Sequence, residues 1–175
     1  EEIDFCRSVF DAHDVTRFEI ADEAEMDALW RARKDLAFAM SAYREDLVPY
    51  HPGDVTVPIS GLPTIVHQIA SMADERDLLV PVFGHAGDGN VHYAVMVDPD
   101  DPDHVERGEA LYHDIVDLAI DLGGTSTGEH GIGLGKRDFL VREHGAGAVE
   151  AMRSIKRGLD PNGILNPGKV FPDEG

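Results

Sequence analysis

The stretch FGHAGDGNVHYAVM, residues 83–96, restricts the possible folds more than any other part of the chain. It places a glycine-rich turn, residues 87–90, between two apolar runs. Glycine adopts a positive φ at no steric cost, so such tetrapeptides commonly join adjacent antiparallel strands. We therefore predict strands at 78–83 and 92–97 that pair as a hairpin. The turn does not require the two histidines that flank it, and their presence needs a separate explanation.

Helical and extended patterns alternate along the remaining chain. Asp22 with Glu25 forms a capping-box pattern, and Pro63 suits the first turn of another helix. The predicted helices cover 1–14, a segment from 22, a segment from 63, 102–122 and 146–158; the other predicted strands are 16–20 and 55–59, with a loop at 49–54 and Pro58 at a sheet edge. Because the central strand pair is antiparallel, we predict an α+β fold, an antiparallel sheet with helices on one face, rather than a doubly wound parallel sheet.

The charge balance is strongly acidic. Asp and Glu number 34 against 15 Lys and Arg, which gives a formal net charge of −19 at pH 7. Such a surface repels phosphate backbones, which disfavours nucleic-acid binding. The same imbalance is typical of proteins adapted to high salt, where ions screen self-repulsion, but it is also found on ordinary acidic surfaces.

The 175 residues suffice for one domain with a real core, or for a piece of a larger protein. The chain begins EEIDFCRSVF, without Met, and reads as a fragment. Its single cysteine, Cys6, cannot form an internal disulfide, and its helical spacing to neighbouring apolar residues predicts a small buried side chain. We find no signal-peptide pattern and no apolar run of membrane-spanning length, so we expect a cytoplasmic protein, or one peripheral at a membrane.

His85, His92 and Glu129 offer two nitrogens and one oxygen, the donor set of a metal site with an open coordination position. Glu129 lies in GGTSTGEHGIGLGKRDF, residues 123–139, whose glycines let the backbone bring distant side chains together. A histidine is more often a hydrogen-bonded surface or core residue than a ligand, so the residues alone leave both interpretations open. His130 is suited to be a general base, because a histidine side chain can accept and release a proton, or to be an ordinary loop histidine.

Three further residues invite comment. Lys136 follows Gly135 as in a phosphate-binding loop, but the preceding glycine and the following Ser or Thr of that motif are missing. Asn90 is expected to stabilise the turn through its side chain. Arg33 falls on a helical stripe that otherwise reads as core, where it either clamps a substrate carboxylate or forms an internal ion pair or extends to solvent.

Four motifs in order resemble one family: DVTVPIS at 54–60, GHAGDGNVH at 84–92, GGTSTGEHGIG at 123–133 and DPNGILNPGKVF at 160–171. They resemble the C-terminal domain of the FAD-linked oxidases, the family of D-lactate dehydrogenase, the FAD-binding subunit of glycolate oxidase and D-2-hydroxyglutarate dehydrogenase. The resemblance implies that residues 1–175 form a substrate- and metal-binding cap, a fragment of a two-domain flavoprotein, with FAD held mainly by an N-terminal domain absent from this chain.

The resemblance also implies roles for single residues. His85, His92 and Glu129 match the positions that hold a divalent metal, typically zinc, in the metal-using branch. His130 matches the general base, and Arg33 matches a residue that grips the substrate carboxylate. The implied reaction oxidises a D-2-hydroxy acid to the 2-oxo acid by hydride transfer to flavin, and the fragment alone is expected to be inactive.

Two departures bear on the substrate. The hydroxyglutarate branch has a Thr where this chain has Ala37, and a Lys where this chain has His51 or Pro52. The second carboxylate contact is therefore in doubt, which favours a monocarboxylate such as D-lactate or glycolate. The expected partners are this small acid, an electron acceptor (a quinone, a cytochrome or an electron-transfer flavoprotein) and a further copy in a homo-oligomer.

The rival interpretations are a free-standing metal-dependent hydrolase and a non-catalytic module that binds a small acid or a partner.

Overall fold

The computed structural model describes residues 1–13, 15 and 19–172, with backbone only at 37, 40 and 41. The chain divides into two units, residues 1–43 and 44–175, which we describe separately. No helix among the described residues combines the length and the apolar character that crossing a membrane would require.

The N-terminal unit contains two helices, α1 (Glu2–Asp11) and α2 (Glu23–Tyr43). The capping box that opens α2 is confirmed: the Glu25 backbone N–H donates to Asp22 Oδ1, and the Asp22 N–H donates to Glu25 Oε2, both at 2.9 Å. The strand predicted at 16–20 falls largely on residues 16–18, which lie outside the described part.

Two predictions about burial in this unit are wrong. Cys6 is exposed, not buried, and no described side chain of the α2 stripe that read as core is buried. Arg33 on that stripe is exposed, which matches the alternative that it extends to solvent, and its guanidinium lies over the ring of Trp30, 5.7 Å from the ring centroid. The helical spacing identified a common face correctly, but on that face Leu29 and Trp30 are more than half exposed and Met26 is 48% exposed. Periodicity shows that residues share a face and cannot show that something covers it.

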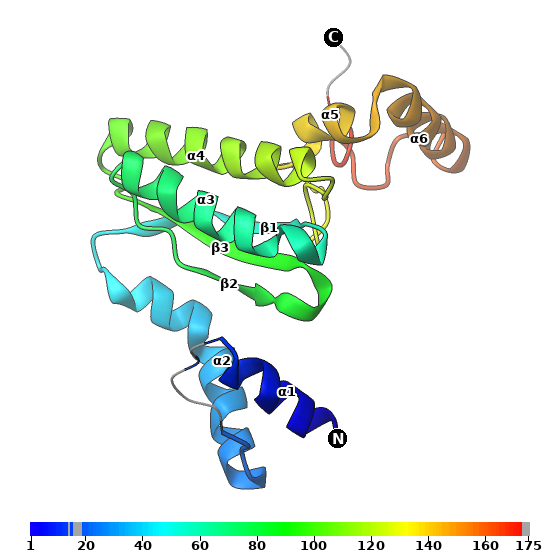
Figure 1. Ribbon diagram of the computed structural model, residues 1–175. Coiled ribbons are helices and arrows are strands. Elements are labelled where there is room, and N and C mark those ends of the chain that lie inside the picture. The colour runs from blue at the N-terminus through cyan, green and yellow to red at the C-terminus, as the bar shows by residue number, and fades with distance from the viewer. Residues whose placement is uncertain (14, 16–18, 173–175) are drawn as a thin grey trace. The chain divides into compact units, whose positions relative to one another are not determined.

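The second unit is built on a three-stranded antiparallel sheet with strand order β1-β3-β2 (Figure 1). The strands are β1 (Val48–Thr56), β2 (Val82–His85) and β3 (Asn90–Val97). The predicted hairpin pairing is confirmed, because β2 pairs with β3 and a short 3₁₀ turn at Ala86–Asp88 joins them, but β2 lies later in the chain than the predicted 78–83 and β3 begins two residues before the predicted 92–97. Gly89 follows at φ 72°, where a Cβ atom would meet the Val57 carbonyl oxygen at 2.0 Å, so this position requires glycine.

The predicted bounds of the first strand were wrong. Instead of 55–59, β1 runs from Val48 to Thr56 and includes the segment that we expected to be a loop. Two prolines fit because β1 is an edge strand and because its register shifts between Pro49 and Pro52. Pro58 stands beyond the end of the strand and precedes a 3₁₀ turn at Ile59–Gly61.

Helices α3 (Leu62–Glu75) and α4 (Pro102–Asp121) lie side by side over one face of the sheet (Figure 1). Each has a proline in its first turn, as predicted, and the Asp101 side chain caps α4. The chain then passes through the glycine-rich loop and a 3₁₀ turn at Arg137–Phe139 to α5 (Leu140–His144) and α6 (Ala146–Leu159). The α+β prediction, with helices on one face, is correct for this unit.

All eight residues of β3 are buried, and they alternate between two environments. Val91, Tyr93, Val95 and Val97 join the core beneath α3 and α4, with Ile65, Ile69, Leu111, Ile115 and Val116. Full burial of one such side chain contributes roughly 1.5–3 kcal/mol to folding. On the opposite face, Ala94 and Met96 pack with Leu47 and Leu79. The other two residues of that face are polar, and there the candidate site begins.

Candidate metal centre

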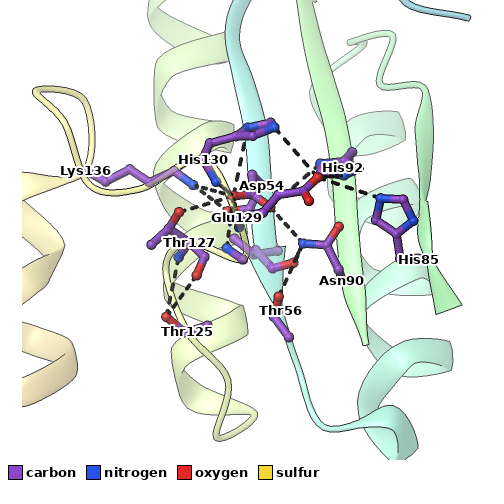
Figure 2. Close-up of polar contacts among 12 residues, drawn as sticks. Asp54, Thr56, His85, Asn90, His92, Thr125, Thr127, Glu129, His130 and Lys136 are labelled. Atoms are coloured by element: carbon purple, nitrogen blue, oxygen red, sulfur yellow. Dashed lines mark hydrogen bonds and ion pairs between the residues drawn. The ribbon is translucent and has the colours of Figure 1, made fainter. Parts of the chain in front are cut away.

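Strand pairing brings polar side chains together on the sheet face opposite the helices. His92 on β3 pairs with Asp54 on β1, and Asn90 pairs with His85 at the end of β2. Directly paired residues point to the same face, so the register alone gathers these four side chains. The loop after α4 adds Glu129 and His130 from the other side of β1 (Figure 2).

Glu129 reaches both hairpin histidines, although it follows His92 by 37 residues in the sequence. Its Oε1 lies 2.9 Å from His92 Nε2 and 3.7 Å from His85 Nε2 (Figure 2). The donor atoms of the three residues all lie within 4.8 Å of one another. Ligand atoms of a tetrahedral centre with bonds of about 2.0–2.2 Å stand roughly 3.4 Å apart, so this group fits a divalent metal.

The surroundings of His92 support the same fit. Its Nδ1 is buried without a hydrogen-bond partner among the described residues and lies 3.7 Å from Asp54 Oδ1. A metal-binding imidazole commonly turns its second nitrogen toward a carboxylate, which fixes the ring orientation. Glu129 is more than half exposed at its side chain and His85 about one third, so the metal position would be open to solvent on one side.

His130 stacks on His92, with ring centroids 5.2 Å apart and planes 18° from parallel. Its Nε2 lies 4.0 Å from Glu129 Oε1, and half of its side chain is exposed. The exposed half leaves the imidazole able to meet a molecule bound beside Glu129. The geometry therefore suits the predicted role of a base, and that role remains a prediction.

Asp54 lies beneath these residues and is fully buried. Its Oδ2 accepts the Thr127 hydroxyl at 3.1 Å and the successive backbone N–H groups of Gly128, Glu129 and His130 at 2.8–2.9 Å. Burial alone would raise the pKa of this carboxyl. Hydrogen bonds from the His130 and Glu129 backbone, aided by Asn90 and Lys136, outweigh it and hold the Asp54 pKa well below its usual range.

Lys136 is the cation beside this carboxylate. Its buried ammonium donates to the Asp54 backbone oxygen and lies 4.0 Å from Oδ2 (Figure 2). Burial lowers the Lys136 pKa to about 8 against the opposing attraction of Asp54 and Glu143. Lys136, which does not belong to a phosphate-binding loop, thus binds a carboxylate-bearing residue of the chain itself.

Asn90 has a different role from the one predicted. Instead of stabilising the turn, its amide donates to Asp54 Oδ1 at 2.8 Å and to Thr56 Oγ1 at 3.3 Å. The loop approaches this amide so closely that a Cβ on Gly128 would lie 2.0 Å from Asn90 Nδ2. Gly128 therefore cannot carry a side chain without displacing the loop.

Sequence reasoning missed Asp54 and the role of Lys136. The available signal was an aspartate immediately before an apolar strand, at a position that strand pairing places opposite His92. In a second donor combination, Asp54 with His92 and His130, the ligand atoms also lie within 4.8 Å of one another. It is a poor metal site, because both Asp54 oxygens already accept hydrogen bonds from the chain. Arg33 belongs to the N-terminal unit, and its predicted carboxylate contact remains a prediction.

Comparison with known proteins agrees with the family resemblance of the four sequence motifs. The family described as FAD linked oxidases, C-terminal domain, matches residues 1–170. The chain is 42% identical over 150 residues to a probable mitochondrial D-lactate dehydrogenase of Danio rerio, covering 86% of this chain and 30% of that protein. It is 38% identical over 176 residues to the mitochondrial D-lactate dehydrogenase [cytochrome] of Arabidopsis thaliana, covering 98% of this chain and 30% of that protein.

Two further similarities extend this picture. A glycolate oxidase subunit of Bacillus subtilis is 38% identical over 149 residues, which cover 85% of this chain and 31% of that protein. The solved structure of a 4-ethylphenol oxidase from Gulosibacter chungangensis matches with a TM-score of 0.65 at 17% identity, over 98% of this chain and 36% of that one. That likeness concerns the fold. The chain spans about 30% of the length of the curated relatives.

Proposed function

The chain belongs to the family of C-terminal domains of FAD-linked oxidases, and we propose that residues 1–175 form the substrate- and metal-binding portion of an FAD-dependent D-2-hydroxyacid dehydrogenase. The proposed reaction converts a D-2-hydroxy acid of the D-lactate or glycolate type to the 2-oxo acid. The relatives named D-lactate dehydrogenase and glycolate oxidase subunit support this substrate class. FAD would be held mainly by residues that correspond to the remaining length of those relatives.

One observation carries the proposal: Glu129 lies within reach of both hairpin histidines, with His130 next to it. We propose that His85, His92 and Glu129 hold a divalent metal, most naturally zinc given two nitrogen donors and one carboxylate. A Lewis acid in this position lowers the pKa of a substrate hydroxyl bound beside it, and the flavin supplies the hydride acceptor.

The chain's own residues would then divide the remaining work. His130 accepts the proton of the α-hydroxyl group as the hydride leaves the adjacent carbon for the flavin, so the acid loses one proton and one hydride, which is two protons and two electrons in total. His92 and Glu129 fix where that hydroxyl lies. Arg33 would attract and orient the substrate carboxylate, which the acidic surface otherwise repels.

Two sequence differences support a monocarboxylate. Ala37 carries no hydroxyl group for a second substrate carboxylate, and neither His51 nor Pro52 supplies the lysine ammonium of the hydroxyglutarate branch. Loss of two polar contacts disfavours a dicarboxylate, because its second charge would be desolvated without a partner. For the electron acceptor we propose a cytochrome, which the name of the Arabidopsis relative includes.

The test uses the full-length flavoprotein. We expect about one metal ion per chain by elemental analysis, and bleaching of the flavin by D-lactate or glycolate without oxygen. His92→Ala and Glu129→Gln should lose most of the metal, whereas His67→Ala, on the exposed surface of α3, should keep it. His130→Gln should retain metal but reduce flavin roughly 10²–10⁴-fold more slowly.

The outcomes separate the rival functions. Equal metal content in wild type, His92→Ala and Glu129→Gln would refute the ligand assignment. Metal-dependent hydrolysis of esters or amides without flavin reduction would favour the hydrolase. Metal or acid binding with no turnover of either kind would favour the binding module.

A further inference from the structure

One carboxylate holds the whole segment that carries the proposed ligand and the proposed base. The N–H groups of Gly128, Glu129 and His130 converge on Asp54 Oδ2 at 2.9, 2.8 and 2.8 Å. Successive N–H groups aimed at one point form an anion-binding site. Here the anion is part of the chain itself, since Asp54 is fully buried and fills the position that an external anion would take.

We propose that Asp54 is a positioning residue that sets the geometry of Glu129 and His130 without touching the substrate. This inference rests on the function proposed above. The two side chains leave the backbone at two of the three residues that Asp54 holds, so a shift of the carboxylate moves both together. Placement within about 0.5 Å is needed for metal and proton-transfer geometry, which makes this anchor functional as well as stabilising.

The remaining contacts of the loop support this role. Thr125 N–H donates to the Thr56 carbonyl at 2.8 Å, and Ser126 N–H donates to Glu143 Oε2 at 2.9 Å. Thr127 N–H reaches Thr125 Oγ1 at 3.5 Å. With the three bonds to Asp54, every backbone N–H from Thr125 to His130 has an acceptor, so the segment is fixed before a ligand arrives.

Asp54 is itself held from three directions. Asn90 donates to Oδ1, Lys136 donates to its backbone oxygen, and strand pairing sets it opposite His92. Its Oδ2 already accepts four hydrogen bonds and its Oδ1 accepts one from Asn90, and no part of the residue reaches solvent. It therefore acts through the residues that it holds, and is neither a ligand nor a base.

The test replaces Asp54 by its isostere in the full-length flavoprotein. In Asp54→Asn, the negative charge is lost and one oxygen becomes an NH₂ group, which cannot accept from the loop's N–H donors or, with the amide rotated, from the Asn90 amide. We expect zinc affinity to fall about 10–100-fold, the loss typical of residues that orient metal ligands. With enough added zinc to restore full occupancy, kcat for D-lactate should still be reduced about 10-fold or more, because His130 is displaced too.

Asp160→Asn is the matched control. Asp160 is also buried, accepts the successive N–H groups of Ile164 and Leu165 and pairs with Lys156, but it lies beyond α6, outside the site. It should lower the melting temperature while zinc affinity and kcat stay within about twofold of wild type. If Asp54→Asn does not fold, Gly128→Ala serves instead, since its Cβ would lie 2.0 Å from Asn90 Nδ2 and 2.7 Å from Asp54 Oδ1 and so forces the loop and its anchor apart while residue 54 keeps its carboxylate.

The results distinguish the two levels of the proposal. Unchanged zinc affinity and unchanged kcat at full occupancy in a folded Asp54→Asn or Gly128→Ala overturn the inference and leave the proposed function standing. Equal losses in Asp160→Asn reduce Asp54 to a general stabilising residue and also overturn it. A wild-type protein without zinc binding or hydroxy-acid oxidation overturns the function and the inference together.

Discussion

Replacement of Lys136 by methionine should change how the stability of the chain depends on pH. The Lys136 side chain is 6% exposed, and burial lowers its pKa to about 8 from the model-compound value of 10.5. Between these two pH values the unfolded chain binds more protons than the folded chain, so stability rises with pH across this window. Below about pH 8 the folded protein bears the full cost of keeping a buried ammonium.

The size of this change in the free energy of unfolding follows from the lowering of the Lys136 pKa. A difference of about 2.5 pKa units corresponds to roughly 3 kcal/mol, of which about 2–3 kcal/mol is relieved between about pH 7 and about pH 10. Lys136→Met has no group to titrate at this position. The free energy of unfolding of wild type relative to Lys136→Met should therefore increase by this amount as the pH is raised.

Urea unfolding of the 175-residue chain at both pH values, followed by far-UV circular dichroism, measures this difference. Fluorescence of the single tryptophan is unsuitable, because Trp30 lies in α2, outside the unit that contains Lys136. Comparison with the variant cancels the titration of other groups. A difference that changes by less than about 1 kcal/mol between the two pH values would refute the argument that burial of this ammonium governs its proton affinity.

Four further substitutions probe the fold, each compared with wild type. Gly108→Ala on α4 should destabilise the chain by about 1–3 kcal/mol in urea unfolding, because its Cβ would meet Val97 Cγ1 at 2.4 Å. Gly158→Ala on α6 has open space around its Cβ and should stabilise the chain by about 0.5–1 kcal/mol. Equal effects of the two substitutions would contradict the packing described for Gly108. Ile115→Ala removes a fully buried core side chain and should cost about 2–5 kcal/mol by the same measurement, and a cost below about 1 kcal/mol would place Ile115 outside the core. Asp22→Ala in a peptide of residues 19–43 should lower helicity by circular dichroism, since the cap contributes about 1 kcal/mol, and unchanged helicity would show that the capping box does not form in isolation.

Local signals predicted most of the second unit. The turn at 87–90, the proline at the start of α3 and the glycines after α4 act within a few residues, and each produced the expected element. The start of β1 could not be predicted in the same way. Pro49 and Pro52 argue against a strand, and only the pairing with β3, which skips residues between them, shows how an edge strand accommodates both.

The site shows a similar division. Residue chemistry suggested His85, His92 and Glu129 as one donor set. The sequence spacing could not show that the loop with Glu129, which follows His92 by 37 residues, lies beside the hairpin in the fold. Asp54 was missed because its importance lies in what surrounds it. A single aspartate in a short strand has no periodic signature, and its role depends on three N–H groups more than 70 residues further along the chain.

Strand β3 also has a consequence for the order in which the site would come apart. It is paired along both edges and buried on both faces, so its amide protons should exchange with solvent only through the largest openings of the unit. The segment 125–130 belongs to no helix or strand, and its N–H groups depend largely on the side chains of Asp54 and Glu143. We therefore expect His92 to keep its place while Glu129 moves away, so that the opening rate of one short loop would set the residence time of a bound ion.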